Sequence, residues 1–215
     1  IIPKHPFNKN IRLRDFISLE SNQKRFFAYF DRVNKILRSW LMLQKKTLSQ
    51  AEIELYQFAY TKYPSLFWHR VQTHLNLTLI HGDAHLKQFY FPSRQNSIAA
   101  CPNMNKHQKQ FAKLTDWEAW SINPGPFDIA YMIGMFFTPI DFEQFPIKML
   151  LRYYHEQLQQ FGINSYRWSD CWFDFRLGMI NNFYIPIWNN NQSMFTKNAR
   201  DWFKTMHCRT LLQNL

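Results

Sequence analysis

Two aspartates stand at places in the sequence where a carboxylate could do chemistry. Asp83 lies in a predicted sharp turn directly after the apolar run at residues 77–80, and Asp116 ends a second apolar run at residues 111–115. A carboxylate at the end of a strand is held by the sheet and still open to solvent, which suits both metal binding and proton transfer. The sequence therefore predicts a chemical centre built on these two side chains.

Short strands are expected to position the two aspartates. Residues 77–80 predict one strand, and residues 89–91 and 111–115 predict the two strands of a hairpin with a long polar connection. The residues after Asp116 carry loop signals and turn helical at Asp128. The first aspartate would thus follow a strand, and the second would follow the hairpin.

Helices are expected on both sides of this segment. Apolar residues recur at helical spacing over residues 19–44, and Ser49 with Glu52 has the pattern of a capping box that starts a second helix. That helix should end before Pro64, because the residue preceding a proline avoids the helical region, and residues 66–75 predict another short helix. The C-terminal part is predicted to be helical, with interruptions near Pro139, Pro146, Gly162 and Pro186.

The composition fits one folded domain. The 215 residues are 46% hydrophobic and 18% aromatic, which supplies a core and argues against disorder. No apolar stretch reaches the roughly 18 residues of a membrane span, and the first residues do not resemble a secretory leader. The three cysteines include no CxxC pair, so neither a thiolate zinc site nor a disulfide framework is expected. We expect a cytoplasmic protein with no membrane partner.

The net charge of +11 is unevenly spread. The first 50 residues contain eleven Lys and Arg against three Asp and Glu, so +8 of the total lies there. Such a basic region is typical of proteins with an anionic partner, although a solvated helix face is the favoured explanation of the charge. No motif of an RNA- or DNA-binding domain is visible, so nucleic acid is not the expected partner.

Three motifs occur in an order that resembles a known family. They are His81-Gly82-Asp83-Ala84-His85, then Thr115-Asp116-Trp117-Glu118, then Gly125-Pro126-x-Asp128-Ile129-Ala130-Tyr131. With this spacing, residues 77–135 resemble the aminoglycoside phosphotransferase and choline-kinase-like group, which is protein-kinase-like. The resemblance extends more loosely over residues 175–211. It implies a mainly helical α+β fold, the C-terminal lobe of a kinase with a small β-hairpin around the catalytic loop.

The resemblance also implies an organisation and an activity. Residues 1–215 would form a single lobe, helical at 1–76 and 136–215, with the catalytic and metal-binding segment at 77–135. The activity implied is that of an ATP-dependent kinase, which moves the γ-phosphate to a hydroxyl of a small molecule and uses Mg²⁺ and ATP. The sequence identifies neither the substrate nor the oligomeric state.

The resemblance assigns roles to the residues of this segment. Asp83 would accept a hydrogen bond from the substrate hydroxyl, and Asp116 would hold the magnesium that bridges the phosphates. Five residues after the catalytic Asp the family usually has an Asn as second metal ligand, and this sequence has Gln88. Because a Gln side chain is one methylene longer and magnesium tolerates little distortion, weakened metal binding is expected.

Three further residues would support the site. His81 and Asp128 are expected to fix the catalytic loop, and His85 would contact the substrate or simply pack. Trp117 and Trp120 are predicted to belong to the core, because large aromatic residues are mostly buried.

The family's phosphate loop has no counterpart in this sequence. Glycines are few, and none precedes residue 82; the five are Gly82, Gly125, Gly134, Gly162 and Gly178. A glycine-rich loop over the phosphates cannot be built without them. We therefore expect a truncated form whose N-terminal nucleotide lobe is missing and whose ATP-binding residues are not assigned. The resemblance implies a kinase, and the missing lobe argues against activity of this chain alone.

Besides a basic helical nucleic-acid-binding protein, whose binding would fall steeply with salt, two alternatives remain open. The first is a catalytically inactive kinase-like remnant that acts as a binding scaffold, which the missing glycines and Gln88 favour. The second is a metal-dependent hydrolase with His81, Asp83 and His85 as ligands, since imidazole and carboxylate suit zinc or iron. A purely structural interpretation of Asp83 as a turn residue would leave the contexts of Asp116 and Asp128 unexplained.

Overall fold

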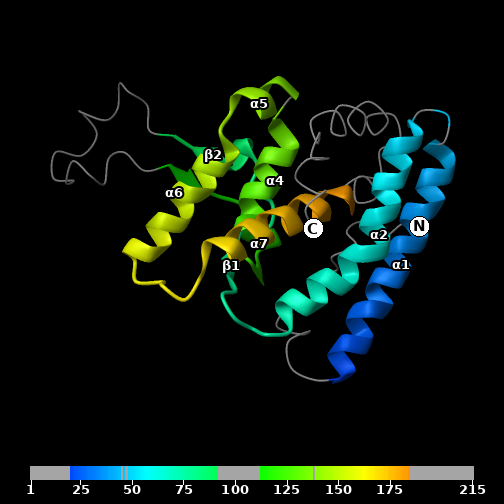
Figure 1. The fold of residues 1–215 in the computed structure, drawn as a ribbon, viewed down its shortest axis with the longest axis horizontal. Helices are drawn as coiled ribbons and strands as arrows, with labels where there is room; N and C mark the ends of the chain where they lie inside the picture. Colours follow the sequence, from blue (N-terminus) through cyan, green and yellow to red (C-terminus); the bar gives the residue numbers. More distant parts are fainter. Residues whose placement is uncertain (1–19, 45, 47, 92–111, 138, 185–215) are drawn as a thin grey trace.

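Helices α1 (Glu20–Gln44) and α2 (Gln50–Val71) run side by side along one edge of the molecule (Figure 1). The computed structural model describes residues 20–44, 46, 48–91, 112–137 and 139–184. The extent of α1 confirms the helix predicted from apolar spacing. At the start of α2 the Ser49 side chain accepts a hydrogen bond from the backbone N–H of Glu52, whose carboxylate accepts one from the backbone N–H of Ser49. The predicted capping box is therefore confirmed.

Pro64 lies inside α2, so the predicted helix end before it and the separate helix at residues 66–75 are wrong. A proline has no N–H to donate, which leaves the carbonyl of Tyr60, four residues earlier, without its helical partner. The buried Asn34 of α1 fills this position, because its Nδ2 donates to the Tyr60 carbonyl at 2.9 Å. Asn34 Oδ1 in turn accepts from the Tyr184 hydroxyl at 3.1 Å. A neighbouring helix thus compensates for the proline.

Two small antiparallel sheets carry the segment between the helices. Strand β1 (Thr78–Ile80) pairs with β4 (Ser121–Asn123), and β2 (Phe89–Tyr90) pairs with β3 (Lys113–Leu114). The predicted first strand and the predicted hairpin are confirmed, whereas β4 was not predicted. Most of the predicted connection between β2 and β3 lies outside the described residues.

Within the described residues, four α-helices follow the sheets. They are α4 (Pro126–Phe136), α5 (Pro139–Gln144), α6 (Ile147–Gln160) and α7 (Trp168–Asn181). The predicted interruptions near Pro139, Pro146 and Gly162 separate them, and Pro186 lies outside the described residues. In the parts of the chain described here, no helix combines the length and the apolar character that crossing a membrane requires.

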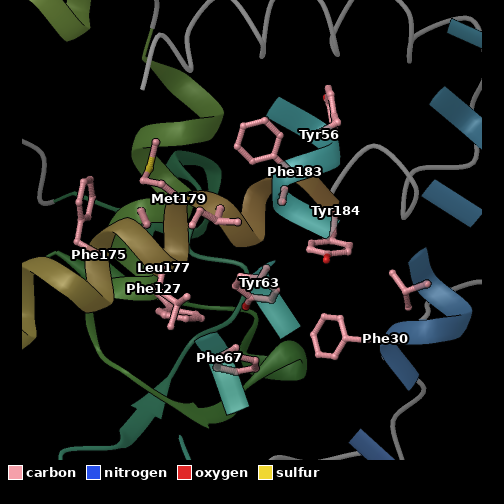
Figure 2. Close-up of a cluster of buried hydrophobic side chains, with 14 of the residues drawn as sticks. Phe30, Tyr56, Tyr63, Phe67, Phe127, Phe175, Leu177, Met179, Phe183 and Tyr184 are labelled. Atoms are coloured by element: carbon pink, nitrogen blue, oxygen red, sulfur yellow. The ribbon is translucent and has the colours of Figure 1, made fainter. Parts of the chain in front are cut away.

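The core forms where α7 crosses between the α1–α2 pair and α4 (Figures 1 and 2). It is rich in aromatic side chains from every one of these elements and from the 3-10 helix η5 (Asn182–Tyr184); Figure 2 labels Phe30, Tyr56, Tyr63, Phe67, Phe127, Phe175, Leu177, Met179, Phe183 and Tyr184. Gly178 allows the close contact of α7 with α4, because a Cβ there would meet the Ala130 side chain at 2.9 Å. This packing gives α4 a rigid support.

A buried ion pair joins α2 to α7 and reaches the segment that enters β1. Arg70 donates from Nε and Nη2 to the two carboxylate oxygens of the fully buried Asp174, at 2.6 and 2.8 Å, and the Tyr166 hydroxyl adds a third bond at 2.7 Å. Burial raises the pKa of Asp174 above its ordinary value, against the opposing effect of Arg70. The same guanidinium donates to the carbonyls of Leu75 and Asn76 at 2.9 and 3.3 Å. Arg70 therefore fixes the chain just before the strand that leads to the candidate site.

Candidate functional site

The loop that follows β1 is fixed to α4 by Asp128. Its carboxylate accepts the backbone N–H of His81 at 2.7 Å and that of Gly82 at 2.9 Å, one on each oxygen. Burial raises the pKa of Asp128, while the two backbone N–H groups oppose that rise. Because Asp128 lies in the first turn of α4, the carboxylate holds the loop against the helix start.

The ring of His81 links this loop to the second sheet. The side chain is fully buried, with Nε2 2.7 Å from the carbonyl oxygen of Thr115 and Nδ1 accepting the backbone N–H of Asp83 at 3.2 Å. Since a carbonyl only accepts and an N–H only donates, the proton lies on Nε2. Both ring nitrogens are therefore used inside the protein, and neither is available as a metal ligand.

Gly82 permits the sharp turn at this point. Its φ is +80°, in the region that favours glycine, and a Cβ on it would collide with the backbone carbonyl of Ala119. The loop and the 3-10 helix η4 (Trp117–Ala119) thus approach each other too closely for any side chain.

The two oxygens of the Asp83 carboxylate have different surroundings. Oδ1 accepts the hydroxyl of Tyr131, on α4, at 2.7 Å, and Oδ2 lies 3.6 Å from Nε2 of His85. The side chain is 36% exposed, so a ligand can reach it. Burial and the adjacent Asp83 raise the pKa of Tyr131, which keeps its hydroxyl protonated as a donor.

Asp116 comes next to Gln88 through the register of the hairpin. Phe89 pairs with Leu114, and the residues just outside this pair are joined by the Thr115 N–H, which donates to the Gln88 carbonyl at 3.0 Å. Asp116 follows with a φ of +63°, and its Oδ2 accepts Nε2 of Gln88 at 2.9 Å. The left-handed backbone at Asp116 turns the carboxylate back toward the first strand of the hairpin.

A network of neighbouring polar side chains lies between the two aspartates, and it is not a continuous chain of hydrogen bonds, because Nε2 of His85 cannot accept from Gln88 and donate to Asp83 at the same time. Gln88 Nε2 lies 3.4 Å from Nε2 of His85, which lies 3.6 Å from Asp83 Oδ2. The order along the network is Asp83, His85, Gln88, Asp116. The structure brings the six predicted site residues together: Asp83, His85, Gln88 and Asp116 form the network, His81 lies in the loop, and Asp128 holds that loop from α4.

The side-chain oxygen atoms of Asp116 and Gln88 are the candidate ligands for a magnesium ion. A carboxylate and an amide oxygen are hard ligands of the kind that magnesium prefers, and magnesium commonly uses only one or two protein ligands besides water and substrate phosphates. The pair therefore fits magnesium in chemical type. The described residues contain no group of three or more His, Cys, Asp or Glu side chains placed to hold a metal ion, and the hydrolase alternative has no ligand cluster there.

Several residues of the site were not found from the sequence. Tyr131 lies three residues after Asp128, on the same face of a helix, and that spacing could have identified it.

Trp117 and Trp120 were expected in the core and are 42% and 38% exposed, so that prediction is wrong. Trp117 instead lies against His81, with ring centroids 4.9 Å apart, and its indole N–H donates to a backbone carbonyl at 3.1 Å.

Comparisons of the chain with protein-family models, with curated proteins and with solved structures found no match in any of the three.

Proposed function

We propose that this chain supplies the catalytic loop and the magnesium ligands of an ATP-dependent phosphotransferase that acts on a hydroxyl of a small molecule. The observation that carries the proposal is the network in which His85 and Gln88 lie between Asp83 and Asp116. Phosphoryl transfer needs alignment of the reactants and neutralisation of charge more than covalent help. Two carboxylates held by rigid elements with polar side chains between them suit that need.

Asp83 would act on the hydroxyl that receives the phosphate. Its Oδ2 is the oxygen not bonded to Tyr131, and it would accept the hydrogen bond of the substrate hydroxyl. The substrate oxygen forms the new bond to the γ-phosphorus, the bond from that phosphorus to the oxygen bridging to the β-phosphate breaks, and the hydroxyl proton passes to the carboxylate. ADP carries away the electron pair of the broken bond.

Asp116 and Gln88 would hold the magnesium ion at the other end of the network. When bound, the ion would neutralise charge on the phosphates of ATP. Gln88 offers Oε1 for this purpose, and its Nε2 bond to Asp116 fixes the position of the amide. No residue of this chain is assigned to binding the nucleotide base or to a phosphate loop.

The second candidate function is a kinase-like scaffold without catalysis. One observation favours it: both aspartates are already hydrogen-bonded inside the protein, Asp83 to Tyr131 at 2.7 Å and Asp116 to Gln88 at 2.9 Å. A ligand set satisfied by its own protein has less need of a metal ion. The scaffold would keep the fold of the loop and bind no magnesium–nucleotide complex.

Calorimetric titration with Mg·ATP separates the two. The wild-type chain is compared with Asp116→Ala and with a control, Glu118→Ala, which removes an exposed acid from the adjacent 3-10 helix. The proposal predicts binding by the wild type and by the control, and loss of binding in Asp116→Ala. Absence of binding by a folded wild-type chain would refute the proposed site and favour the scaffold. Equal binding by all three proteins would refute Asp116 as a magnesium ligand.

A further inference from the structure

Tyr131 is the one side chain of α4 that bonds directly to the carboxylate of Asp83 among the hydrogen bonds of the described residues. It lies three residues after Asp128, so both side chains project from the same face of the helix toward the loop. Their bonds go to three consecutive residues: Asp128 receives the N–H groups of His81 and Gly82, and Tyr131 donates to Asp83. The backbone and the carboxylate of the loop are thus fixed by one helix.

The helix that makes these bonds is itself fixed. Ala130 and Ile133 are fully buried on the core side of α4, and Asn182 donates to the carbonyl of Ala130 at 2.9 Å. Close-packed cores transmit position with little play, since side chains in them interdigitate. The hydroxyl of Tyr131 is therefore a fixed point against which the short Asp83 side chain can be oriented.

The hydroxyl is a donor over the whole neutral range. Burial, the side-chain bond and the charge of Asp83 all raise the pKa of Tyr131. A donor fixed on one carboxylate oxygen holds the position and the plane of the Asp83 carboxylate. It leaves Oδ2, which faces His85, as the oxygen available to a ligand.

We propose that Tyr131 is a positioning residue, which holds the Asp83 carboxylate in one rotamer with Oδ2 turned toward the substrate hydroxyl. The role in turnover rests on the proposed phosphotransferase function, whereas the effect on the Asp83 rotamer does not. A misplacement of a reacting group by about 1 Å can reduce a rate by about a hundredfold. Loss of this bond should therefore act on turnover and leave nucleotide binding alone.

The test compares the wild type with Tyr131→Phe and with Tyr63→Phe. Tyr63 is the matched control, because its hydroxyl also donates one hydrogen bond, to Asn181 at 2.9 Å, and this partner lies on α7 and not on the loop. The first readout is the side-chain rotamer of Asp83, taken from three-bond couplings between its backbone and β-protons in selectively labelled protein. We expect one rotamer in the wild type and in the control, and rotamer averaging in Tyr131→Phe.

The second readout is phosphoryl transfer from Mg·ATP to a pool of hydroxyl compounds. We expect Tyr131→Phe to lower kcat by about tenfold to a hundredfold with an unchanged KM for ATP, and the control to keep both values. A single Asp83 rotamer in folded Tyr131→Phe would overturn the positioning role, whatever the activity. If rotamer averaging occurs and the wild type fails to bind Mg·ATP, the positioning role stands and the phosphotransferase function falls.

A second measurement covers the case in which Tyr131→Phe does not fold. The hydroxyl proton of Tyr131 should exchange slowly with water in the wild type, because it is held by Asp83. Replacement of Asp83 by Ala should abolish this protection. Equal protection in the wild type and in Asp83→Ala would contradict the inference.

Discussion

Replacement of Arg70 by Met would break the buried ion pair between α2 and α7 and leave Asp174 fully buried with one remaining donor, the Tyr166 hydroxyl. Removing one partner of a buried pair costs about 3–5 kcal/mol, because the other charge stays buried and uncompensated. The two bonds from Arg70 to the carbonyls of Leu75 and Asn76 are lost as well, and these lie near solvent, where their contribution is smaller. We expect the free energy of unfolding at pH 7 to fall by about 4 kcal/mol.

The pH dependence of this loss follows from the titration of Asp174. Burial raises its pKa in the folded protein above the ordinary value of 3.8. The stability associated with this group is therefore fully present below about pH 3.8 and is lost as pH rises through the folded pKa. Removing Arg70 removes an effect that lowers this pKa, so the folded value rises further. The destabilisation by Arg70→Met should be largest near neutral pH and smaller near pH 4.5.

The loss of unfolding free energy in Arg70→Met is measured by urea unfolding at pH 7 and at pH 4.5, followed by circular dichroism. Arg167→Met is the matched control, since it breaks an ion pair with Asp170 in which Arg167 is 77% exposed, and exposed pairs contribute little. A double replacement, Arg70→Met with Asp174→Leu, should recover much of the lost stability, because apolar pairs can substitute for buried ion pairs. A loss below about 1 kcal/mol for Arg70→Met, or a loss that grows as pH falls, would refute the reasoning.

Three further outcomes are expected. Asn34→Ala should destabilise the protein by about 2 kcal/mol, because it leaves the part-buried carbonyl of Tyr60 without a donor. The loss should be at least about 1 kcal/mol smaller in a Pro64→Ala background, whose restored N–H takes that carbonyl; a denaturant double-mutant cycle measures the difference, and additive effects would contradict it. Gly82→Ala should cost about 3 kcal/mol in urea unfolding, because it combines a left-handed backbone with a collision, and a wild-type midpoint would show that the turn is not constrained. Gln88→Asn should tighten Mg²⁺ binding in calorimetry, because the side chain becomes one methylene shorter and magnesium tolerates little distortion; weaker binding would show that the longer side chain, fixed by its bond to Asp116, is the better ligand here.

Much of the secondary structure could be predicted because its signals are local. The capping box at Ser49 and Glu52 lies within four residues, and its hydrogen bonds form as the pattern requires. The hairpin strands were found from short apolar runs, whereas their register, which pairs Phe89 with Leu114, was not predicted. The strand β4 escaped prediction because Ile122 is its one apolar residue, which is too short a pattern to indicate a strand without the pairing with β1.

The end of α2 could not be predicted because the decisive contact is distant in sequence. A proline normally ends a helix, and the local pattern around Pro64 gives no reason to expect otherwise. Asn34 supplies the missing donor from another helix, and only the packing of α1 on α2 reveals it. Tertiary structure overrides a local preference here.

The residues of the candidate site could be chosen from the sequence, whereas the contacts among them could not be predicted. Asp83, Asp116 and Gln88 were selected by motif, and the network among them depends on the hairpin register and on the turned backbone at Asp116. Tyr131 was part of a quoted motif and received no role, because its partner Asp83 is fixed only by the fold. The exposure of Trp117 likewise depends on its place in η4, whereas residue type gives only the average burial of tryptophan.

The central claim is that Asp83 serves phosphoryl transfer from ATP to a hydroxyl. The most direct measurement incubates the chain with Mg²⁺, ATP labelled in the γ-phosphate and a pool of small hydroxyl compounds, and detects phosphate monoesters by mass spectrometry. We predict a labelled monoester from the wild type and at least about a hundredfold less from Asp83→Asn, since a positioned base contributes on that scale. No monoester from a folded wild type that binds Mg·ATP, or equal yields from both proteins, would contradict the account.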